Sequence, residues 1–456
     1  MNFDKLHRVL FLGVGGIGMS ALARYFKSLD IQVFGYDKTE TTLTQQLQKE
    51  GIEVVFEDNL EWLSTILSSA NQSNFLAIYT PAVPPDLKLK TALEQSGLPF
   101  MKRAKALGLI TQNSLNLSVA GTHGKTTTST LLAHILNEAG VPSVAFLGGI
   151  SSNFNSNYHN TIIPAKPVIS ITEADEFDRS FLHLSPKYAV ITSVDADHLD
   201  IYGSADEMLK SFQAFGERVN PDGLLLVHHS IKHHFERATT YGINYGHYSA
   251  QNVHINDGKF VFDLVYENEI FRLLTLGMAG IHNVENAVAA SVLALKMGIS
   301  ENDLRKALAN FKGVKRRFEF IVRNEKHIYI DDYAHHPTEL KAAIGSAKKL
   351  FPNKKITGVF QPHLYSRTRD FQEGFAESLS MLDEVILMDI YPARELPIEG
   401  ITSQIIFDKI TAQDKKIWTP TQILDSVQNN PREVLLTLGA GDIDRLIEPI
   451  KTILKP

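Results

Sequence analysis

The chain has 456 residues, of which 44% are hydrophobic and 21% charged, an ordinary composition for a globular protein. This length exceeds what one hydrophobic core supports and predicts two to four domains. The formal net charge of −6 gives no electrostatic reason to expect nucleic acid or an anionic membrane as a partner. No apolar run approaches the roughly 18 residues of a transmembrane helix, and the N-terminus lacks the apolar region of a signal peptide. The chain has no cysteine for disulfides or thiolate metal sites, and we expect a cytoplasmic protein.

The first block alternates short apolar strands with helical stretches, which predicts a parallel α/β sheet with strands at 9–12, 32–36 and 76–79. A glycine-rich turn follows the first strand, and an acid ends the second. This pattern satisfies the dinucleotide fingerprint, in which glycines allow close approach of a diphosphate and the acid receives a ribose hydroxyl. It does not identify the ligand: NAD is one candidate, and glycines that only permit close helix–sheet packing are the alternative. The candidate residues are Gly15, Gly16, Ile17, Gly18, Met19, Ser20 and Asp37.

The second block, joined to the first by an expected link at 99–116, opens with Ala-Gly-Thr-His-Gly-Lys-Thr-Thr over residues 120–127. A β-rich run enters this segment and a helix-forming run leaves it, which predicts a phosphate cradle of backbone N–H groups at a helix N-terminus. Lys125 would reach the β- and γ-phosphates of a nucleotide, and the Thr126 hydroxyl would bind Mg²⁺. Val119 stands where the general pattern has its first glycine, so we expect a shortened loop. The candidate nucleotide-binding residues are Gly121, Thr122, His123, Gly124, Lys125, Thr126 and Thr127.

Two acidic clusters follow strands expected at 168–171 and 188–194; the first contains Glu173 and the second ends at His198. Carboxylates and imidazole at the carboxyl ends of strands beside a phosphate loop are placed to hold Mg²⁺ on ATP, with solvated loop acids as the alternative. The alternation from 241 to 276 predicts antiparallel hairpins. An Ala-rich helix then opens with His282 and Asn286, where asparagine is either an N-cap or an amide that reads adenine.

The third block, from about residue 313, predicts another α/β unit with strands at 356–360, 385–390 and 434–438. Two adjacent histidines on extended chain face opposite ways, so we do not expect a metal site there. Clustered arginines after a strand end favour recognition of a carboxylate or a phosphate over a merely exposed charged face. The candidate residues of this block are Arg317, Asp332, His335, His336, His363, Arg367 and Arg369.

In this order the motifs resemble those of the Mur ligases, which build the peptide stem of bacterial peptidoglycan. The motifs are Gly-Val-Gly-Gly-Ile-Gly-Met-Ser, Gly-Thr-His-Gly-Lys-Thr-Thr, Glu-Ala-Asp-Glu, Asp-His-Leu-Asp, His-Asn-Val-Glu-Asn, Arg-Arg-Phe and Asp-Asp-Tyr-Ala-His-His-Pro-Thr-Glu. The resemblance runs from about residue 9 to 446. It implies three α/β domains: a UDP-sugar domain at 1–105, a central ATP-binding domain at 106–313 and a C-terminal domain of dinucleotide-fold type at 314–456. The glycine turn would then hold the diphosphate of UDP rather than NAD.

The resemblance is closest to the ligases that join L-alanine to the lactyl carboxylate of UDP-N-acetylmuramate. It implies an ATP-dependent reaction through an acyl phosphate, with Mg²⁺ as the metal and a monomer or homodimer as the assembly. The implied catalytic residues are Lys125, Glu173, His198 and Arg317. The implied metal ligands are Thr126, Glu173 and His198. The implied ATP contacts include His282 and Asn286 at adenine and Asp332 at the ribose. The residues implied near the amino acid and the sugar are His335, His336, His363, Arg367 and Arg369.

Three positions depart from the family pattern. Gln213 stands where several relatives carry a carbamylated lysine, so no such modification is expected. Leu364 replaces an arginine that often follows the histidine of Pro-His, and Phe177 replaces a small serine. Two alternatives stay open. One is the murein-peptide recycling ligase, which joins a tripeptide to the same sugar nucleotide. The other is a nicotinamide-dependent oxidoreductase, which would leave the phosphate loop and the third block without a task.

Overall fold

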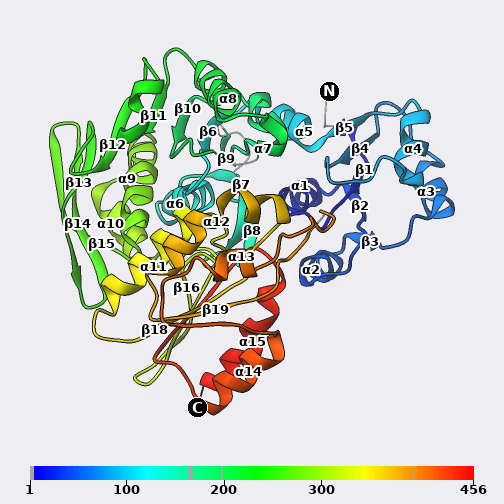
Figure 1. Ribbon diagram of the computed structural model, residues 1–456. Helices are drawn as coiled ribbons and strands as arrows, with labels where there is room; N and C mark the ends of the chain where they lie inside the picture. Colours follow the sequence, from blue (N-terminus) through cyan, green and yellow to red (C-terminus); the bar gives the residue numbers. More distant parts are fainter. Residues whose placement is uncertain (1–4, 163–167, 197–198, 394, 456) are drawn as a thin grey trace. The chain divides into compact units, whose positions relative to one another are not determined.

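The computed structural model describes residues 5–162, 168–196, 199–393 and 395–455, and the described strands form three sheets (Figure 1). The chain divides into two compact units. The first unit comprises Met1–Gln251, Leu264–Phe271 and Asn286–Asn310. The second comprises Asn252–Asp263, Arg272–Glu285 and Phe311–Pro456.

The first sheet confirms the predicted parallel α/β block, with strand order β3-β2-β1-β4-β5 and parallel pairing throughout. Its strands are β1 (Arg8–Leu12), β2 (Gln32–Tyr36), β3 (Glu53–Val55), β4 (Phe75–Tyr79) and β5 (Phe100–Lys102). Its helices are α1 (Ile17–Ser28), α2 (Thr42–Lys49), α3 (Leu60–Leu67) and α4 (Lys88–Gln95). The stretch expected as a link, 99–116, is instead ordered structure: β5 pairs with β4, and α5 (Arg103–Thr111) follows directly. Its backbone hydrogen bonds are satisfied by the sheet and a helix, which a linker would not provide.

The second sheet has ten described strands in the order β15-β14-β13-β12-β11-β10-β6-β9-β7-β8. They are β6 (Leu115–Ala120), β7 (Ser143–Ser151), β8 (Ser156–Asn160), β9 (Ile169–Glu173), β10 (Tyr188–Ile191), β11 (Leu224–His228), β12 (Thr239–Ile243), β13 (Tyr248–Asn256), β14 (Lys259–Tyr266) and β15 (Glu269–Leu276). Strand β6 lies between β9 and β10 and is parallel to both. The carboxyl ends of these three strands therefore meet at one edge of the sheet, as the positions of the phosphate loop and acidic clusters predict.

The predicted hairpins occur only from β13 onward. Two-residue connections join β13 to β14 and β14 to β15, and such short connections require antiparallel neighbours. Both residues of the first connection, Asp257 and Gly258, have positive φ, as a type I′ turn requires. Strand β12 instead pairs with β13 in parallel, with Tyr241 opposite Tyr248. The alternating pattern alone does not distinguish the two pairings, because it reports only which side of each strand is buried.

Within the first unit, α1 packs against the β7–β8 hairpin of the second sheet. Tyr25 of α1 lies 5.5 Å from the ring of Phe146 and 6.4 Å from that of Tyr158. The Asn157 side chain donates to Ser20 Oγ at 2.9 Å and accepts from Arg24, which also forms two bonds to Glu50. This polar and aromatic contact fastens the helix that follows the glycine turn to the second sheet.

The third sheet has the order β16-β17-β21-β18-β19-β20, with β16 antiparallel to β17 and the other pairs parallel. Its strands are β16 (Glu319–Arg323), β17 (Ile328–Asp332), β18 (Ile356–Phe360), β19 (Glu384–Leu387), β20 (Asp414–Ile417) and β21 (Val434–Leu438). Its helices are α11 (Pro337–Leu350), α12 (Tyr365–Leu379), α13 (Gln404–Phe407), α14 (Pro420–Asn429) and α15 (Ile447–Leu454). Helix α14 begins with Pro420 after a reciprocal cap between Thr419 and Gln422, a strong local start signal.

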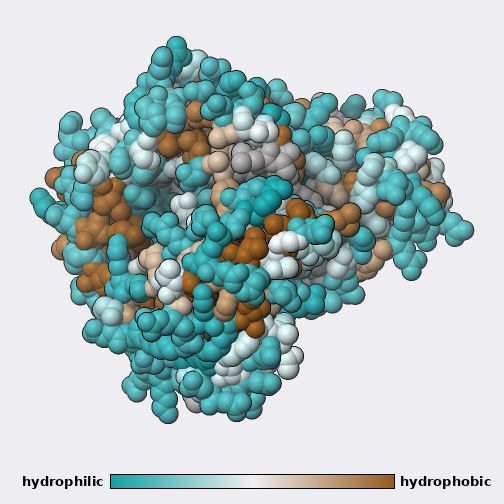
Figure 2. Space-filling view, viewed as in Figure 1, coloured by the Kyte–Doolittle hydropathy of each residue, from teal (hydrophilic) through white to brown (hydrophobic). Residues whose placement is uncertain are grey.

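Helices of the second sheet include α6 (Lys125–Glu138), α7 (Leu199–Tyr202), α8 (Ala205–Glu217), α9 (Ile281–Lys296) and α10 (Glu301–Asn310). Over the described residues, no helix combines the length and apolar character needed to cross a bilayer. Hydrophilic residues cover most of the face visible in Figure 2, with apolar residues confined to smaller areas.

A buried ion cluster in the third sheet gives a stability prediction. Glu384, 4% exposed, accepts hydrogen bonds from Arg432 at 3.0 Å, Lys416 at 3.0 Å and Thr357 at 2.9 Å. Burial raises the pKa of Glu384, but these donors outweigh burial and lower it to about 2. The stabilisation is therefore complete above the unfolded-state pKa and disappears as the pH falls from about 4.5 to about 2.

We expect Glu384→Gln to lower the free energy of unfolding at pH 7 by about 3 kcal/mol, because Arg432 would remain buried without its counter-charge. Urea unfolding of both proteins between pH 7 and pH 3 measures this. The difference should shrink below pH 4.5. Glu433→Gln is the control, since Glu433 pairs with Lys354 on the surface at 3.8 Å and should matter by less than about 0.5 kcal/mol. A constant difference across the pH range would contradict the assignment.

Candidate active site

The turn between β6 and α6 has the backbone geometry of a phosphate cradle. Gly121 has φ of 129° and Gly124 has φ of 80°, both in the region that favours glycine. A Cβ on Gly121 would overlap Thr192, and a Cβ on Gly124 would lie 2.7 Å from Asn286 Oδ1. Gly124 is the N-cap of α6 and contributes no side-chain cap, so the first turn of the helix directs its N–H groups outward as an anion site requires.

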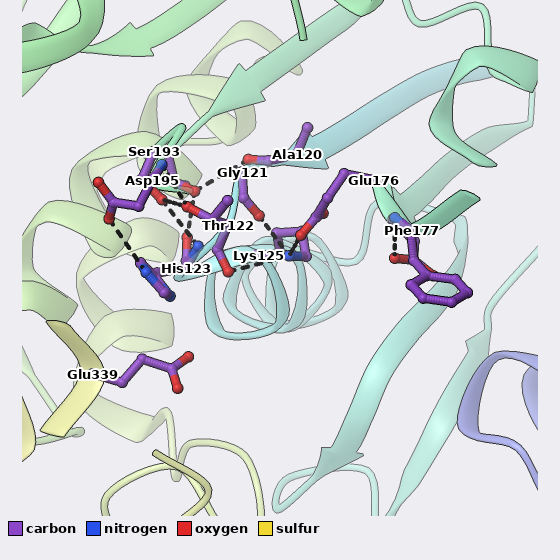
Figure 3. Close-up of polar contacts among 12 residues, drawn as sticks. Ala120, Gly121, Thr122, His123, Lys125, Glu176, Phe177, Ser193, Asp195 and Glu339 are labelled. Atoms are coloured by element: carbon purple, nitrogen blue, oxygen red, sulfur yellow. Dashed lines mark hydrogen bonds and ion pairs between the residues drawn. The ribbon is translucent and has the colours of Figure 1, made fainter. Parts of the chain in front are cut away.

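The chain beyond β10 holds this turn in place (Figure 3). Strand β10 ends at Ile191, three residues earlier than predicted, and the following residues cross to the turn. The Thr122 and Ser193 hydroxyls lie 2.8 Å apart, Ser193 Oγ accepts from the His123 N–H at 2.9 Å, and His123 Nε2 lies 3.2 Å from Asp195 Oδ2. The acidic cluster after β10 thus begins by fixing the loop. His198, predicted as a metal ligand, lies outside the described residues.

Lys125, at the start of α6, is drawn back into the loop by a buried carboxylate. Its Nζ donates to Gly121 O at 2.5 Å and to Glu176 Oε1 at 2.9 Å, and the two side chains are 13% and 2% exposed (Figure 3). Burial lowers the pKa of Lys125, but the carboxylates of Glu176 and Glu173 outweigh it and raise the pKa overall. Burial also raises the pKa of Glu176, which by itself favours the neutral acid. The short separation and the second acceptor at Gly121 favour the ammonium–carboxylate form.

Glu173, the predicted Mg²⁺ ligand, ends β9 opposite Val119 of β6. Its Oε2 accepts from the Gly148 N–H at 3.0 Å, and a Cβ on Gly148 would overlap both carboxylate oxygens. Thr126 lies in the first turn of α6. Across the described chain, no group of three or more metal-binding side chains is found. One carboxylate and one hydroxyl beside a phosphate loop still fit Mg²⁺, which usually takes few protein ligands and completes its shell with phosphate oxygens and water.

Helix α9 carries both residues predicted at adenine. It begins at Ile281, so Asn286 lies inside the helix and the N-cap alternative is not what the structure shows. Asn286 is buried, and its Oδ1 accepts from Thr128 Oγ1 at 3.1 Å next to Gly124. Burial lowers the pKa of His282 to about 4, so the ring is neutral at pH 7. His282 Nδ1 is buried and makes no hydrogen bond with any described residue, which fits the prediction that it contacts a ligand.

The residues predicted to bind at the glycine turn of the first sheet fall into two groups, those in the turn itself and those buried in α1. Gly16 is the N-cap of α1 without a side-chain cap, and the Gly15 N–H donates to Asp37 Oδ2 at 2.8 Å. Asp37 therefore already contacts the turn that it was predicted to serve. Met19 and Ser20 are buried within α1, at 1% and 0% exposed. Their structural environment is packing, and their predicted contact with substrate stays a prediction, as do those of Ile17 and Gly18.

In the second unit, the two adjacent arginines differ in their contacts. Arg316 is held by Asp331 at 3.1 Å and by Gly439 O at 2.7 Å, whereas Arg317 lies 3.6 Å from Glu339. Asp332, predicted at the ribose, accepts from the N–H groups of Phe318 and Ala334, both at 2.7 Å. Burial raises the pKa of Asp332 to about 7. Through these hydrogen bonds, Asp332 holds the backbone next to Arg317 in place.

The histidines and the second arginine pair also separate. His335 Nδ1 lies 3.3 Å from Glu339, and its ring is 6.0 Å from that of His363. His336 caps α11 by accepting from the Thr338 N–H at 3.4 Å. Arg367 is buried in α12, whereas Arg369, two residues further, is exposed and pairs with Asp370 at 2.7 Å. Residues two apart on a helix point to opposite sides, so the structure does not bring the two guanidinium groups together.

The three departures lie in different surroundings. Phe177 donates its N–H to Asp175 Oδ1 at 3.1 Å beside Glu176. Gln213 lies on α8 and donates to His234 O at 3.1 Å. Leu364 is the N-cap of α12 with φ of 68°, a strained conformation for leucine.

Sequence reasoning noted Asp175 and Glu176 only as members of the acidic cluster expected to hold Mg²⁺, and it passed over Arg103, which opens α5. Arg103 Nη2 lies 2.8 Å from Asp175 Oδ2. The dense run of acids was a signal that more than one of them has a cationic partner, but the partners are distant in sequence.

Family models match almost the whole chain. The Mur ligase family catalytic domain matches residues 8–114, the Mur ligase middle domain residues 119–294, and the Mur ligase glutamate ligase domain residues 316–443. The chain belongs to the Mur ligase family. These matches confirm the resemblance and the three-sheet α/β fold that it implies.

The proteins whose sequences or structures are similar to this chain include several that are named as ligases. A UDP-N-acetylmuramate–L-alanine ligase of Christiangramia forsetii is 48% identical over 455 residues, which are 99% of each chain. One of Flavobacterium johnsoniae is 46% identical over 100% of this chain and 99% of its own. The solved UDP-N-acetylmuramate–alanine ligase of Thermotoga maritima matches this Mur ligase with a TM-score of 0.79 at 27% identity, over 97% and 98% of the two chains. A murein peptide ligase of Psychrobacter arcticus matches with a TM-score of 0.69 at 21% identity, over 99% and 100%, which shows the fold alone.

The geometry of the phosphate loop predicts that two glycine substitutions differ in cost. Gly124 and Gly140 both have positive φ, but a Cβ on Gly140 has nothing within 4 Å. Alanine at either position should cost about 1 kcal/mol of backbone strain. Gly124→Ala should cost about 1–3 kcal/mol more, because it also displaces Asn286. Urea unfolding of both variants measures the difference. Equal losses would contradict the packing described for the loop.

Proposed function

We propose that this Mur ligase uses ATP to join L-alanine to the lactyl carboxylate of UDP-N-acetylmuramate. The observation that carries the proposal is the cradle between β6 and α6, with Lys125 at its helix end, in a chain that aligns over its full length with ligases named for this reaction. The reaction places several anions against one another, so a buried lysine and helix N–H groups are suitable for the site.

In the proposed reaction, an oxygen of the lactyl carboxylate attacks the γ-phosphorus of ATP, and ADP leaves. The amine of alanine then attacks the carbonyl carbon of the acyl phosphate. Phosphate departs with the bridging oxygen, and the nitrogen gives up its proton to leave an amide. The enzyme contributes mainly by positioning these groups and by neutralising the transferring phosphate.

We assign Lys125 to the transferring phosphate and the N–H groups of Gly121–Thr127 to the phosphate oxygens. Glu173 and Thr126 would hold Mg²⁺, which would neutralise charge on the phosphates. The glycine turn before α1, with Asp37, would hold the UDP portion. The roles of His198, Arg317, Asp332 and His282, and those of the histidines and arginines near α11 and α12, rest on the family resemblance and stay predictions.

The remaining assignments are also proposals. We propose a UDP-sugar domain at 1–105, an ATP-binding domain at 106–313 and a third domain at 314–456, supported by family models whose limits fall near these positions. The family resemblance supports a cytoplasmic enzyme. We keep monomer or homodimer as the proposed assembly.

The recycling ligase is the alternative that shares this fold, and its acceptor distinguishes it. A tripeptide presents its first carboxylate as an amide, so an arginine that forks onto the α-carboxylate of alanine loses a charged partner, worth about 1.5–3 kcal/mol. Arg367, which is buried in α12, is the arginine that we propose for that fork.

We therefore expect alanine to be accepted at least about tenfold better in kcat/KM than L-Ala-γ-D-Glu-meso-diaminopimelate. The measurement is phosphate release from ATP with UDP-N-acetylmuramate, comparing the tripeptide with alanine, glycine and serine. Omission of the sugar nucleotide is the control. Faster turnover of the tripeptide than of alanine would move the protein to recycling.

The role of Lys125 predicts loss of activity together with a specific change in stability. Lys125→Met should lower the rate on the order of 10³-fold, because the transferring phosphate loses its cation. It should also destabilise the fold, because Glu176 is left buried and charged. The double variant Lys125→Met/Glu176→Gln should regain stability but no activity. Phosphate release and urea unfolding test both parts, and a rate above a tenth of wild type in either variant would reject the role.

A further inference from the structure

The Lys125–Glu176 ion pair keeps the phosphate-binding lysine turned inward. Glu176 Oε2 is buried and makes no hydrogen bond with any described residue, so Lys125 is the cation that compensates this carboxylate. The backbone of Glu176 is also fixed, because Tyr202 Oη donates to its carbonyl at 2.5 Å. A phosphate that draws Lys125 outward must therefore compete with a buried, rigid carboxylate.

The residue before Glu176 is held by a second cation that lies beside the glycine turn. Arg103 Nη2 lies 2.8 Å from Asp175 Oδ2, and the Arg103 side chain is only 17% exposed. A Cβ on Gly18 would lie 2.8 Å from Arg103 Nη1, so the guanidinium packs against the first turn of α1. Asp175 Oδ1 also accepts from the Phe177 N–H at 3.1 Å, which ties the acidic segment together.

The position of Arg103 is electrostatically unfavourable without an anion. The N-terminus of a helix carries partial positive charge, so a guanidinium beside the first turn of α1 is repelled by the helix dipole. Asp175 alone compensates this repulsion among the contacts described for Arg103. A diphosphate at the glycine turn would satisfy the helix and the guanidinium together and would compete with Asp175 for Arg103.

We propose that Arg103, Asp175 and Glu176 are positioning residues that couple the glycine turn to the phosphate loop. A UDP-sugar diphosphate draws Arg103 from Asp175, the segment that carries Glu176 loosens, and Lys125 is released to bind the phosphates of ATP. The inference rests on the proposed function, because it needs a diphosphate at the glycine turn. Coupling of this kind is reciprocal, so each ligand tightens the binding of the other by the same factor.

Calorimetric titration with the non-hydrolysable ATP analogue AMP-PNP, in excess Mg²⁺, tests the inner ion pair without any sugar nucleotide. Glu176→Gln keeps the shape of the side chain and removes its charge. It should bind AMP-PNP at least about fivefold more tightly than the wild type, because Lys125 is no longer retained. Unchanged or weaker binding by a variant whose circular dichroism spectrum shows that it is folded would overturn the proposal, whether or not the enzyme has the proposed activity.

Repeating the titration with saturating UDP-N-acetylmuramate tests the relay. The sugar nucleotide should tighten AMP-PNP binding to the wild type at least about fivefold, and to Arg103→Met and Glu176→Gln less than about twofold. Arg103→Lys, which keeps the charge, should give an intermediate ratio of AMP-PNP affinities with and without the sugar nucleotide. If Glu176 only repelled ATP, the sugar nucleotide would instead tighten AMP-PNP binding to Glu176→Gln by the same factor as to the wild type.

Lys102→Met is the matched control. Lys102 lies next to Arg103 and pairs at 2.8 Å with Asp178, but the Lys102 side chain is 46% exposed, against 17% for Arg103. Its ratio should equal that of the wild type. A wild type that binds both ligands without coupling, or an Arg103→Met variant that keeps the full ratio, would overturn this inference alone. A wild type that does not bind UDP-N-acetylmuramate would overturn the proposed function together with the coupling.

Discussion

The rest of the first unit depends on one constraint: the crowded turn after β6 must hold the charged side chain of Lys125. Gly121 and Gly124 have no room for a side chain, so the loop after β6 passes close to Thr192 and Asn286. That closeness lets segments from β9, β10 and α9 reach one small volume. Lys125 is then surrounded by acids and carbonyl groups, and its charge makes their burial tolerable. The same crowding that stabilises the loop therefore prepares it for a highly charged ligand.

Neighbouring residues of the same type repeatedly have different contacts in this protein. Arg316 is held by Asp331 at 3.1 Å and by Gly439 O at 2.7 Å, whereas Arg317 lies 3.6 Å from Glu339 and over the Tyr333 ring. His336 caps α11, whereas His335 faces Glu339 and His363. In each pair one side chain holds local structure, and a ligand contact of the other stays a prediction. A sequence motif does not distinguish the two members of a pair, because both are polar and adjacent.

The sequence was sufficient for features that depend on local pattern. The parallel strands and the loop–helix junction at Lys125 follow from alternation, glycine spacing and helix start signals, and the structure has them. Contacts between segments that are far apart in the sequence could not be predicted. Nothing local indicates that Glu176 meets Lys125, that Asp175 meets Arg103, or that 99–116 completes a sheet and a helix. The direction of pairing between β12 and β13 was also hidden, because alternation reports burial and not orientation.

The central claim is that the lactyl carboxylate is activated by direct phosphorylation at the Lys125 loop. The most direct measurement uses UDP-N-acetylmuramate labelled with ¹⁸O in both oxygens of that carboxylate, with ATP and L-alanine, and mass spectrometry of the released phosphate. Attack of the carboxylate on the γ-phosphorus predicts that each phosphate carries one ¹⁸O atom, because the bridging oxygen leaves with it. Release of unlabelled phosphate during amide formation would contradict this account.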